Sequence, residues 1–499
     1  MFCYLPKYPA TLSLLVIVLG AMSLSCCEYL SQELGLVAFP DSAAYNATEL
    51  SYWSTQEAKV APSCVVTPES SSDVSDFVAI VSQITNCSFA IKGQGHSPAA
   101  GTANIQDGVT LDLTSLNTTT ISNDHTVASV GTGSAWVDVY RTLQPYNKTV
   151  AGGRNGAVGV GGLTLSGGIS YYSPQVGFTS DTVVNYEIVL ASSEIVNANA
   201  TTNGDLFYAL QGGGNNFGIV TRFDFATVDT VDLAEGHLTN PTNHTEDVLR
   251  AFANIVASSN YDVHASIVTS LIFNSTSKAW AVASVPQYTL PNPSPAIYNE
   301  LFSIPNITAA TSFSIENIST LSAEPPYPQI YELFFTATYA ASSGDAVTEL
   351  LINIYNSLNT TLTANSPPGI TWALNLEPLP IAFTSHTKHN LFNLNQAENA
   401  FMYLLSVSWT NDTVSTAAYS LAQTVLQDMD NLARAQGLFR NFRYANYADP
   451  SQDVLGSYGE ASVEFLKNVS AKYDPTGVFQ YQVPGGFKIS NAGFSYLNS

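Results

Sequence analysis

The sequence has few charged residues, and among these few are basic. Asp, Glu, Lys and Arg make up 11% of its 499 residues, and 16 Lys and Arg stand against 39 Asp and Glu, a net charge of -23 at pH 7. A surface this acidic repels the phosphates of nucleic acids and of anionic lipids. We therefore expect neither nucleic acid nor a membrane as a partner. Apolar residues make up 45%, which suits a chain long enough for two folded domains.

Several common site motifs are missing. No G-x-G-x-x-G motif follows a predicted strand and no G-x-x-x-x-G-K-[S/T] loop is present, which argues against a Rossmann dinucleotide site and a P-loop. Neither H-E-x-x-H nor paired C-x-x-C occurs, so the sequence predicts no metal site.

Long apolar runs are missing after the N-terminus. At the start, an apolar segment over residues 12–21 follows one lysine and precedes small residues at positions 23 and 25. The segment is shorter than the ~20 residues that cross a bilayer, so we interpret residues 1–25 as a secretory signal peptide and not as a membrane anchor. We therefore expect the protein to be secreted, or to reside in the lumen of the secretory pathway.

Cysteine is scarce, with five residues. Cys3 lies in the predicted signal peptide, and the state of Cys26 and Cys27 at its end is left open. Cys64 and Cys87 flank a predicted helix, so we expect a disulfide between them in an oxidising compartment, with two buried free thiols as the alternative.

Asparagine sequons are frequent, which is typical of a secreted glycoprotein. They occur at Asn46, Asn86, Asn117, Asn147, Asn199, Asn243, Asn274, Asn306, Asn317, Asn359, Asn411 and Asn468.

The periodicity of apolar residues indicates an α+β chain. A strand at 65–66, a helix at 71–83 and a strand at 89–91 follow a lead-in, residues 28–62, that we expect to be irregular. From about residue 230 to 435, strands alternate with helices, which favours an antiparallel sheet with helices on one face.

Glycine is concentrated in three blocks, residues 89–98, 151–168 and 211–218. Glycine lets the backbone approach a ligand closely, and the first block presents a histidine, His96, between a short strand and a loop. These blocks mark the candidate binding site.

Together with the C-terminal segment, the glycine blocks resemble the FAD-binding PCMH-type flavoproteins, specifically the berberine-bridge-enzyme-like FAD-linked oxidases. The matching motifs occur in the family's order over nearly the whole chain after the predicted signal peptide: 92–97, 158–162 with 167–168, 181–184, 212–220, 446–447 and 472–475. The resemblance implies a two-subdomain FAD-binding domain of residues 60–230, completed by residues 436–499. An antiparallel-sheet α+β substrate domain of residues 231–435 lies between these two segments.

The resemblance also implies the cofactor, FAD. A chain this poor in Lys and Arg can hold the FAD diphosphate through the backbone amides of glycine-rich turns. His96 corresponds to the histidine that the family joins covalently to the flavin 8-methyl carbon. The residues expected to line the cofactor are His96, Gly93, Gln94, Gly95, Ser97, Val158, Gly161, Gly162, Gly218, Val220 and Asn446.

Two positions in the second glycine block refine this expectation by resemblance. Asn155 stands where many relatives have a second linking cysteine, so we expect one covalent link and a substrate smaller than an oligosaccharide. Val158 stands where valine usually permits reaction of the flavin with O2, which implies O2 as the electron acceptor.

The expected catalytic residues are Tyr447 and Tyr444. Tyr447 matches a tyrosine that takes a proton from the substrate hydroxyl in relatives, and for this its pKa of ~10 has to be lowered by a cation or by hydrogen bonds. Arg443 is a cation nearby in the sequence. Some relatives carry a catalytic glutamate in the strand that corresponds to residues 401–409, which here has no acid, and Glu377 in the preceding strand is the available substitute.

The resulting hypothesis is a secreted, monomeric FAD-linked oxidase that oxidises a hydroxyl of a small organic molecule and reduces O2 to H2O2. A secondary metabolite is the first substrate expectation and a carbohydrate the second. A secreted serine hydrolase is the alternative from another class, because residues 95–99 imitate a nucleophile elbow around Ser97. The sequence after Ser97 begins with Pro98 and is a poor helix, which disfavours this alternative.

Overall fold

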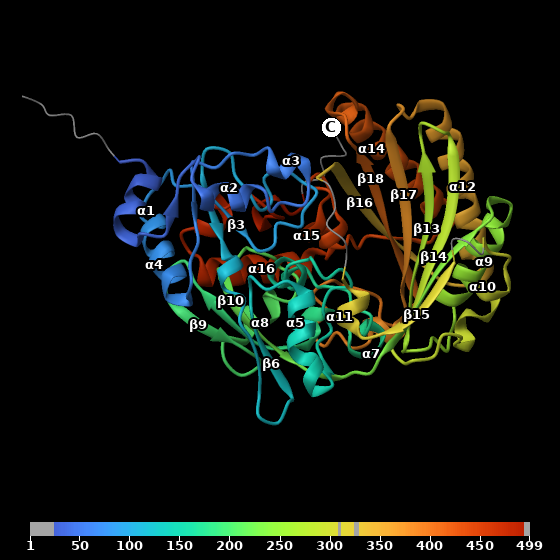
Figure 1. The fold of residues 1–499 in the computed structure, drawn as a ribbon, viewed down its shortest axis with the longest axis horizontal. Helices are drawn as coiled ribbons and strands as arrows, with labels where there is room; N and C mark the ends of the chain where they lie inside the picture. Colours follow the sequence, from blue (N-terminus) through green and yellow to red (C-terminus); the bar gives the residue numbers. More distant parts are fainter. Residues whose placement is uncertain (1–23, 308–310, 324–328, 494–499) are drawn as a thin grey trace, which may run out of the picture.

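The chain forms two lobes, seen on the left and right of Figure 1. The structure is a computed structural model and describes residues 24–307, 311–323 and 329–493. The predicted signal peptide therefore lies outside the described residues, except for its last two positions. Three sheets, of four, five and eight strands, determine the architecture.

The first sheet of the left lobe has the strand order β1-β2-β4-β3. Its strands are β1 (Val37–Ala38), β2 (Cys64–Val66), β4 (Val109–Asp112) and β3 (Phe89–Lys92), of which β2, β4 and β3 run parallel. The crossover helix α4 (Ser71–Val81) begins at its N-cap Ser70, whose side chain accepts a hydrogen bond from the amide of Asp73. Because β3 ends at Lys92, the first glycine block begins at the edge where the parallel strands end.

The second sheet of this lobe is antiparallel, with the order β5-β6-β10-β8-β9. Its strands are β5 (Thr119–Ile121), β6 (Val127–Gly131), β10 (Ile219–Ala226), β8 (Val183–Val189) and β9 (Ile195–Ala198). Helix α6 (Val160–Leu165) carries the second glycine block, and the third block leads from helix α8 (Gly204–Ala209) into β10. The glycine blocks therefore converge between the two sheets.

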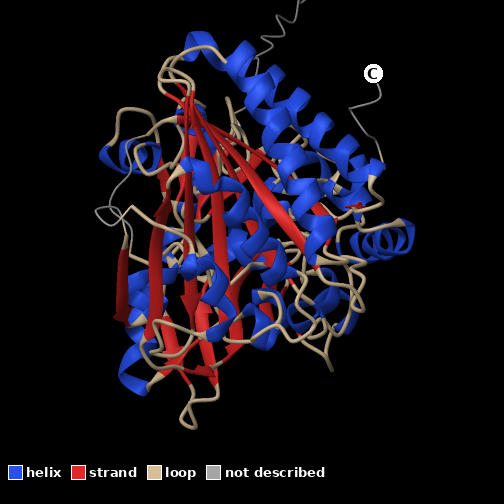
Figure 2. Cartoon of the chain, turned by 90° about the vertical axis from the view of Figure 1, so that its right-hand side faces the viewer, coloured by secondary structure: helices blue, strands red, loops and turns tan. Residues whose placement is uncertain are grey.

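The right lobe is built on an eight-stranded antiparallel sheet with the order β15-β12-β14-β13-β17-β18-β16-β19. Its helices α9 (Thr245–Val256), α12 (Gly344–Asn365) and α14 (Ser415–Ala435) pack their apolar sides on one face, and Figure 2 shows helices in front of its strands. The opposite face is turned to the left lobe. The strands are β12 (Leu233–Asn240), β13 (Ala265–Asn274), β14 (Ala279–Tyr288), β15 (Ser312–Glu316), β16 (Tyr331–Ala340), β17 (Ile370–Leu379), β18 (Ala400–Trp409) and β19 (Phe439–Arg440).

The C-terminal segment returns to the left lobe, where its red ribbon lies among the blue and green elements of Figure 1. It contains α15 (Val454–Ser457) and α16 (Glu460–Tyr473), and α16 packs against α8. Shorter elements connect the rest: β7 (Lys148–Thr149), β11 (Val228–Asp229), α5 (Trp136–Leu143), α7 (Ser173–Val176), α10 (Asn299–Ser303), α11 (Ile318–Leu321) and α13 (Ile381–Thr384).

The segment before β2 is helical, so the expectation of an irregular lead-in is wrong. It contains α1 (Cys26–Leu34), α2 (Ala43–Glu49) and α3 (Thr55–Ala58). A capping box starts α1, with Ser25 and Glu28 each bonding the backbone amide of the other.

The predicted disulfide between Cys64 and Cys87 is also wrong. Cys26 is bonded to Cys87, and Cys27 to Cys64. Helix α1 packs on α4, which places consecutive cysteines against the two ends of the strand-helix-strand unit. The two bonds therefore fasten the N-terminal helix to the rest of the left lobe.

The sequon asparagines are accessible. Ten of the twelve are exposed, and Asn199 and Asn317 are half-buried. In the described part of the chain, no helix combines the length and the apolar character needed to cross a bilayer.

The disulfide pairing can be tested by non-reducing peptide mapping. Cleavage after Glu69 separates Cys64 from Cys87, and both should be found linked to the peptide that contains Cys26 and Cys27. In a Cys27→Ser variant, Cys64 should become alkylatable while Cys26 and Cys87 stay linked, and stability should fall by ~2–5 kcal/mol. A peptide linking Cys64 directly to Cys87 would contradict the structure.

Candidate active site

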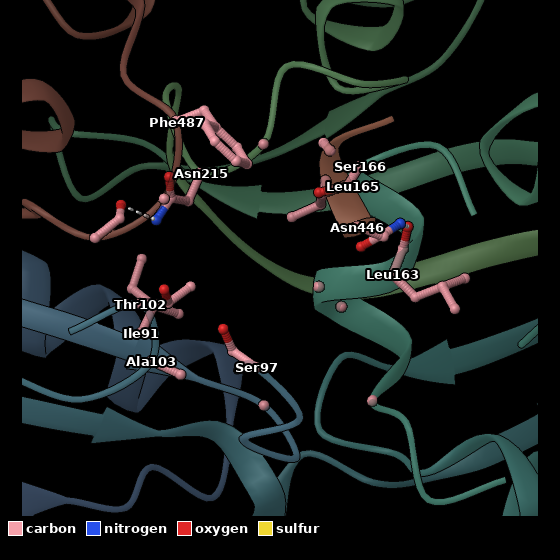
Figure 3. A pocket seen from close by; sticks show the side chains of 18 of the residues that line it. Ile91, Ser97, Thr102, Ala103, Leu163, Leu165, Ser166, Asn215, Asn446 and Phe487 are labelled. Carbon is pink, nitrogen blue, oxygen red and sulfur yellow. Dashed lines mark hydrogen bonds between the residues drawn. The ribbon is translucent and has the colours of Figure 1, made fainter. Parts of the chain in front are cut away.

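A cavity of about 360 Å³ lies where the glycine blocks converge. Figure 3 shows its walls: Ile91, Ser97 and Thr102 on one side, Leu163 and Ser166 of the α6 region on another, and Asn215 with Phe487 above. All eleven residues expected to line the cofactor do line this cavity: Gly93, Gln94, Gly95, His96, Ser97, Val158, Gly161, Gly162, Gly218, Val220 and Asn446. The structure thus brings together segments from both sheets and from the C-terminal segment.

The glycines in this wall leave room for a ligand. A Cβ at Gly162 would meet no atom within 4 Å, and one at Gly93 would meet only the Thr132 carbonyl oxygen, at 3.9 Å. At Gly161 a Cβ would lie 2.5 Å from the Thr132 hydroxyl, so this glycine is needed for packing. Gly95 has φ +68 and lies against the Tyr52 ring, which excludes other residues there.

The His96 ring is half-buried, and its Nε2 atom is fully buried. Its ring stacks on Trp53, with centroids 4.5 Å apart and planes at 17°, and its Nε2 atom has no hydrogen-bond partner among the described residues. Burial lowers the pKa of the imidazole to about 4, so the ring is neutral at physiological pH. A neutral imidazole nitrogen has a lone pair available for a bond to a ligand.

Lys92 does not enter the cavity. It is buried in an ion pair with Asp112, 3.1 Å from Nζ to Oδ2, and the Thr48 hydroxyl donates to the same oxygen at 2.8 Å. Of the described residues that line the cavity, none is Lys or Arg. A bound anion would therefore be held by neutral donors.

A buried three-residue network lies beside the cavity. Arg154 donates through Nη2 to Glu377 Oε2 at 2.7 Å and to the Tyr447 hydroxyl at 2.9 Å. Tyr447 in turn donates to Glu377 Oε1 at 2.9 Å. Its neighbour Asn446, in the cavity wall, bonds the Leu163 carbonyl and the Tyr444 hydroxyl. The network is therefore connected to the cavity by one peptide unit.

The large sheet positions the carboxylate of Glu377. Side chains alternate between the two faces of β17, which puts Leu374 and Leu376 in the core under the helices and turns Glu377 to the left lobe. Glu377 pairs in register with Met402 of β18, the strand that lacks an acid. The carboxylate at this site therefore comes from β17, the strand next to β18, as the sequence allowed.

The Tyr447 hydroxyl is neutral in this setting, contrary to the expected lowered pKa. Burial and the Glu377 carboxylate raise the pKa of Tyr447 well above its ordinary value, although Arg154 acts in the opposite direction. Arg443 is not the nearby cation, because it pairs with Asp430 at 2.5 Å. Arg154 could not be identified in this role from the sequence, since 293 residues separate it from Tyr447.

Two other expected site residues, Tyr444 and Ser97, make packing and backbone contacts. Tyr444 is buried edge-to-face against Tyr447, with centroids 4.9 Å apart, and burial raises its pKa. Ser97 Oγ accepts a hydrogen bond from the amide of Ala99, and no helix follows it. The loop thus lacks the strand-turn-helix geometry of a nucleophile elbow.

Comparison with known proteins identifies the family. Residues 62–199 match the FAD binding domain family. The chain is 35% identical over 485 residues to the FAD-dependent monooxygenase sdcF of Emericella nidulans, covering 95% of this chain and 100% of the relative. It is 34% identical to the FAD-dependent monooxygenase drtC of Aspergillus calidoustus, covering 93% and 90%. The chain belongs to the berberine-bridge-enzyme-like, PCMH-type FAD oxidoreductases.

Solved structures show the same fold. Berberine bridge enzyme from Eschscholzia californica superimposes with a TM-score of 0.72 at 15% identity, covering 93% of this chain and 99% of that one. The cavity fits the cofactor of this family, because its glycines leave open space and His96 presents an unpartnered nitrogen.

The buried pair of this flavoprotein gives a stability test. Replacing Arg154 by Met leaves the Glu377 carboxylate buried without its cation, which should destabilise the fold by ~3–5 kcal/mol in urea unfolding. Adding Glu377→Leu should recover most of this loss. As a control, Arg141→Met removes an exposed pair with Asp138 and should cost less than ~1 kcal/mol. Equal losses in the buried and exposed variants would contradict the described network.

Proposed function

We propose that this flavoprotein is a secreted oxidase that removes two hydrogens from a carbinol of a small organic molecule. The bound FAD would take up the hydride and pass the electrons to O2, which leaves as H2O2. The flavin domain would comprise residues 60–230 and 436–499, and the substrate domain residues 231–435. A single copy of the chain would suffice, since both lobes contribute to the site.

The observation that carries the proposal is the placement of the Tyr447 hydroxyl between Arg154 and Glu377. A phenol oxygen has one hydrogen and two lone pairs. The hydrogen goes to Glu377, and one lone pair accepts from Arg154. The second lone pair is available to a substrate hydroxyl.

This arrangement favours a proton relay. As Tyr447 takes the hydroxyl proton of the substrate, its own proton passes to Glu377, so the phenol never has to stand ionised despite its raised pKa. Arg154 stabilises the negative charge that develops on the phenol oxygen and holds the carboxylate in place. Tyr444 fixes the ring of Tyr447 from its side.

Substitution of Tyr447 tests the relay. Tyr447→Phe should lower kcat by ~10²–10⁴-fold with little change in the amount of bound flavin, because it removes proton transfer and preserves the ring. The matched control is Tyr481→Phe, at a tyrosine that is 74% exposed, and it should retain full activity. Wild-type rates in Tyr447→Phe would contradict the proposed role.

His96 is proposed as the single covalent tether of the flavin, supported by its place in the cavity wall and its unpartnered, buried Nε2 atom. Acid-precipitated, deglycosylated protein should be yellow and carry the mass of one FAD. His96→Ala should release the flavin on precipitation, while native preparations of the variant still bind it. A colourless wild-type precipitate would show that the flavin is not covalently bound.

Monooxygenation is the second candidate, favoured by the fungal relatives sdcF and drtC, which are named FAD-dependent monooxygenases. Oxygen-18 separates the two reactions. An oxidase sends both atoms of O2 into peroxide, whereas a monooxygenase places one atom in the product and one in water. Label in the peroxide and none in the product supports the oxidase.

A further inference from the structure

A second cavity, of about 520 Å³, lies beside the first at the junction of the two lobes. The two cavities share Pro98, Ala99, Ala100 and Pro450 in their walls. The residues after His96 thus form a partition between them. A molecule in the second cavity would lie next to the flavin site and still be accessible from outside.

The walls of this cavity are aromatic and acidic. Aromatic side chains come from β16, β18 and α14, and no Lys or Arg is among the described residues that line it. Three carboxylates do line it, of which Asp412 pairs with Lys59 and Asp449 accepts from Tyr419 and Ser451. These two acids therefore already have partners.

Glu332, the third carboxylate, has an oxygen without a partner among the described residues. It lies in β16, is 8% exposed, and accepts one hydrogen bond, from Ser406 Oγ to Oε1 at 2.6 Å. Its Oε2 atom makes no hydrogen bond to any described residue, and burial raises the pKa of the carboxyl to about 7. A buried carboxyl with a free oxygen in a cavity wall calls for a donor from a ligand.

Glu332 is separate from the proton relay. It pairs in register with Ser408 of β18, whereas Glu377 pairs with Met402, six residues away along the same strand. At ~3.3 Å per residue, the two carboxylates lie roughly 20 Å apart along the sheet. Phe334, two residues on, contacts Trp53, which stacks on His96. Glu332 is therefore at the histidine end of the flavin site.

We propose that the second cavity is a binding site of its own for a small aromatic molecule and that Glu332 binds a hydrogen-bond donor on it, so that neutral and cationic aromatic molecules are accepted and anionic ones rejected. Ring stacking against the aromatic wall supplies affinity, and the unpaired oxygen of Glu332 supplies selection. An aromatic carboxylate would lie against three carboxylates, of which Asp412 is already paired with Lys59. The inference goes beyond the proposed function, since a ligand here is distinct from the molecule oxidised beside Glu377.

Calorimetric titration of the flavin-loaded protein with benzylamine, benzyl alcohol and benzoate tests the selection. Benzylamine and benzyl alcohol should bind, and benzoate should bind at least about 10-fold more weakly. Glu332→Gln should weaken benzylamine about 10-fold or more, with a smaller loss for benzyl alcohol, because it removes the charge and keeps the shape. Asp138→Asn, which makes the same change in net charge on the surface of α5, should leave all three affinities unchanged.

A second variant tests the location. Thr416→Trp, on the exposed side of α14 in the cavity wall, should weaken all three probes without altering bound flavin. Benzoate binding as tightly as benzylamine, or unchanged benzylamine binding in Glu332→Gln, would overturn the proposal. Binding is measured without turnover, so an absence of oxidase activity would refute the proposed function and leave this result standing.

Discussion

The backbone of the glycine-rich turns has to come close to an anionic cofactor, FAD, and the rest of the structure depends on this constraint. The chain has 16 basic residues, and none of the described ones lines the cavity between the two sheets of the left lobe. In our account, the amide groups of three glycine-rich turns supply the positive ends of dipoles where other proteins use Lys or Arg. The fold has to bring those turns together from distant parts of the chain, and the two sheets and the C-terminal return accomplish this.

The large antiparallel sheet contributes two carboxylates on the side that faces the left lobe. Its helix-covered face is apolar, and the face turned to the left lobe carries Glu377 and Glu332 at separate positions. Glu377 is paired with Arg154 and is the proposed acceptor of the relay proton, whereas Glu332 has a free oxygen in the aromatic cavity. The proposed proton transfer and the proposed binding of an aromatic molecule thus use different acids on one surface.

The residues of the cavity wall could be predicted from the sequence because they lie in short contiguous motifs, and all eleven residues expected at the cofactor line one cavity. Contacts that depend on tertiary packing could not be predicted in this way. The disulfide pairing follows from the packing of α1 on α4, and α1 lies in a segment without clear periodicity of apolar residues. Arg154 and Glu377 meet across 223 residues, while the cation adjacent in sequence, Arg443, turns to Asp430. Proximity along the chain therefore did not identify the cation beside Tyr447.

The salt dependence of FAD binding to the untethered His96→Ala protein tests the central claim most directly. If neutral amides hold the cofactor, its dissociation constant should change by less than about threefold between 0.05 M and 1 M NaCl, since no side-chain ion pair is screened. A loss of affinity of tenfold or more over this range would show that basic side chains hold the diphosphate, and would contradict the account.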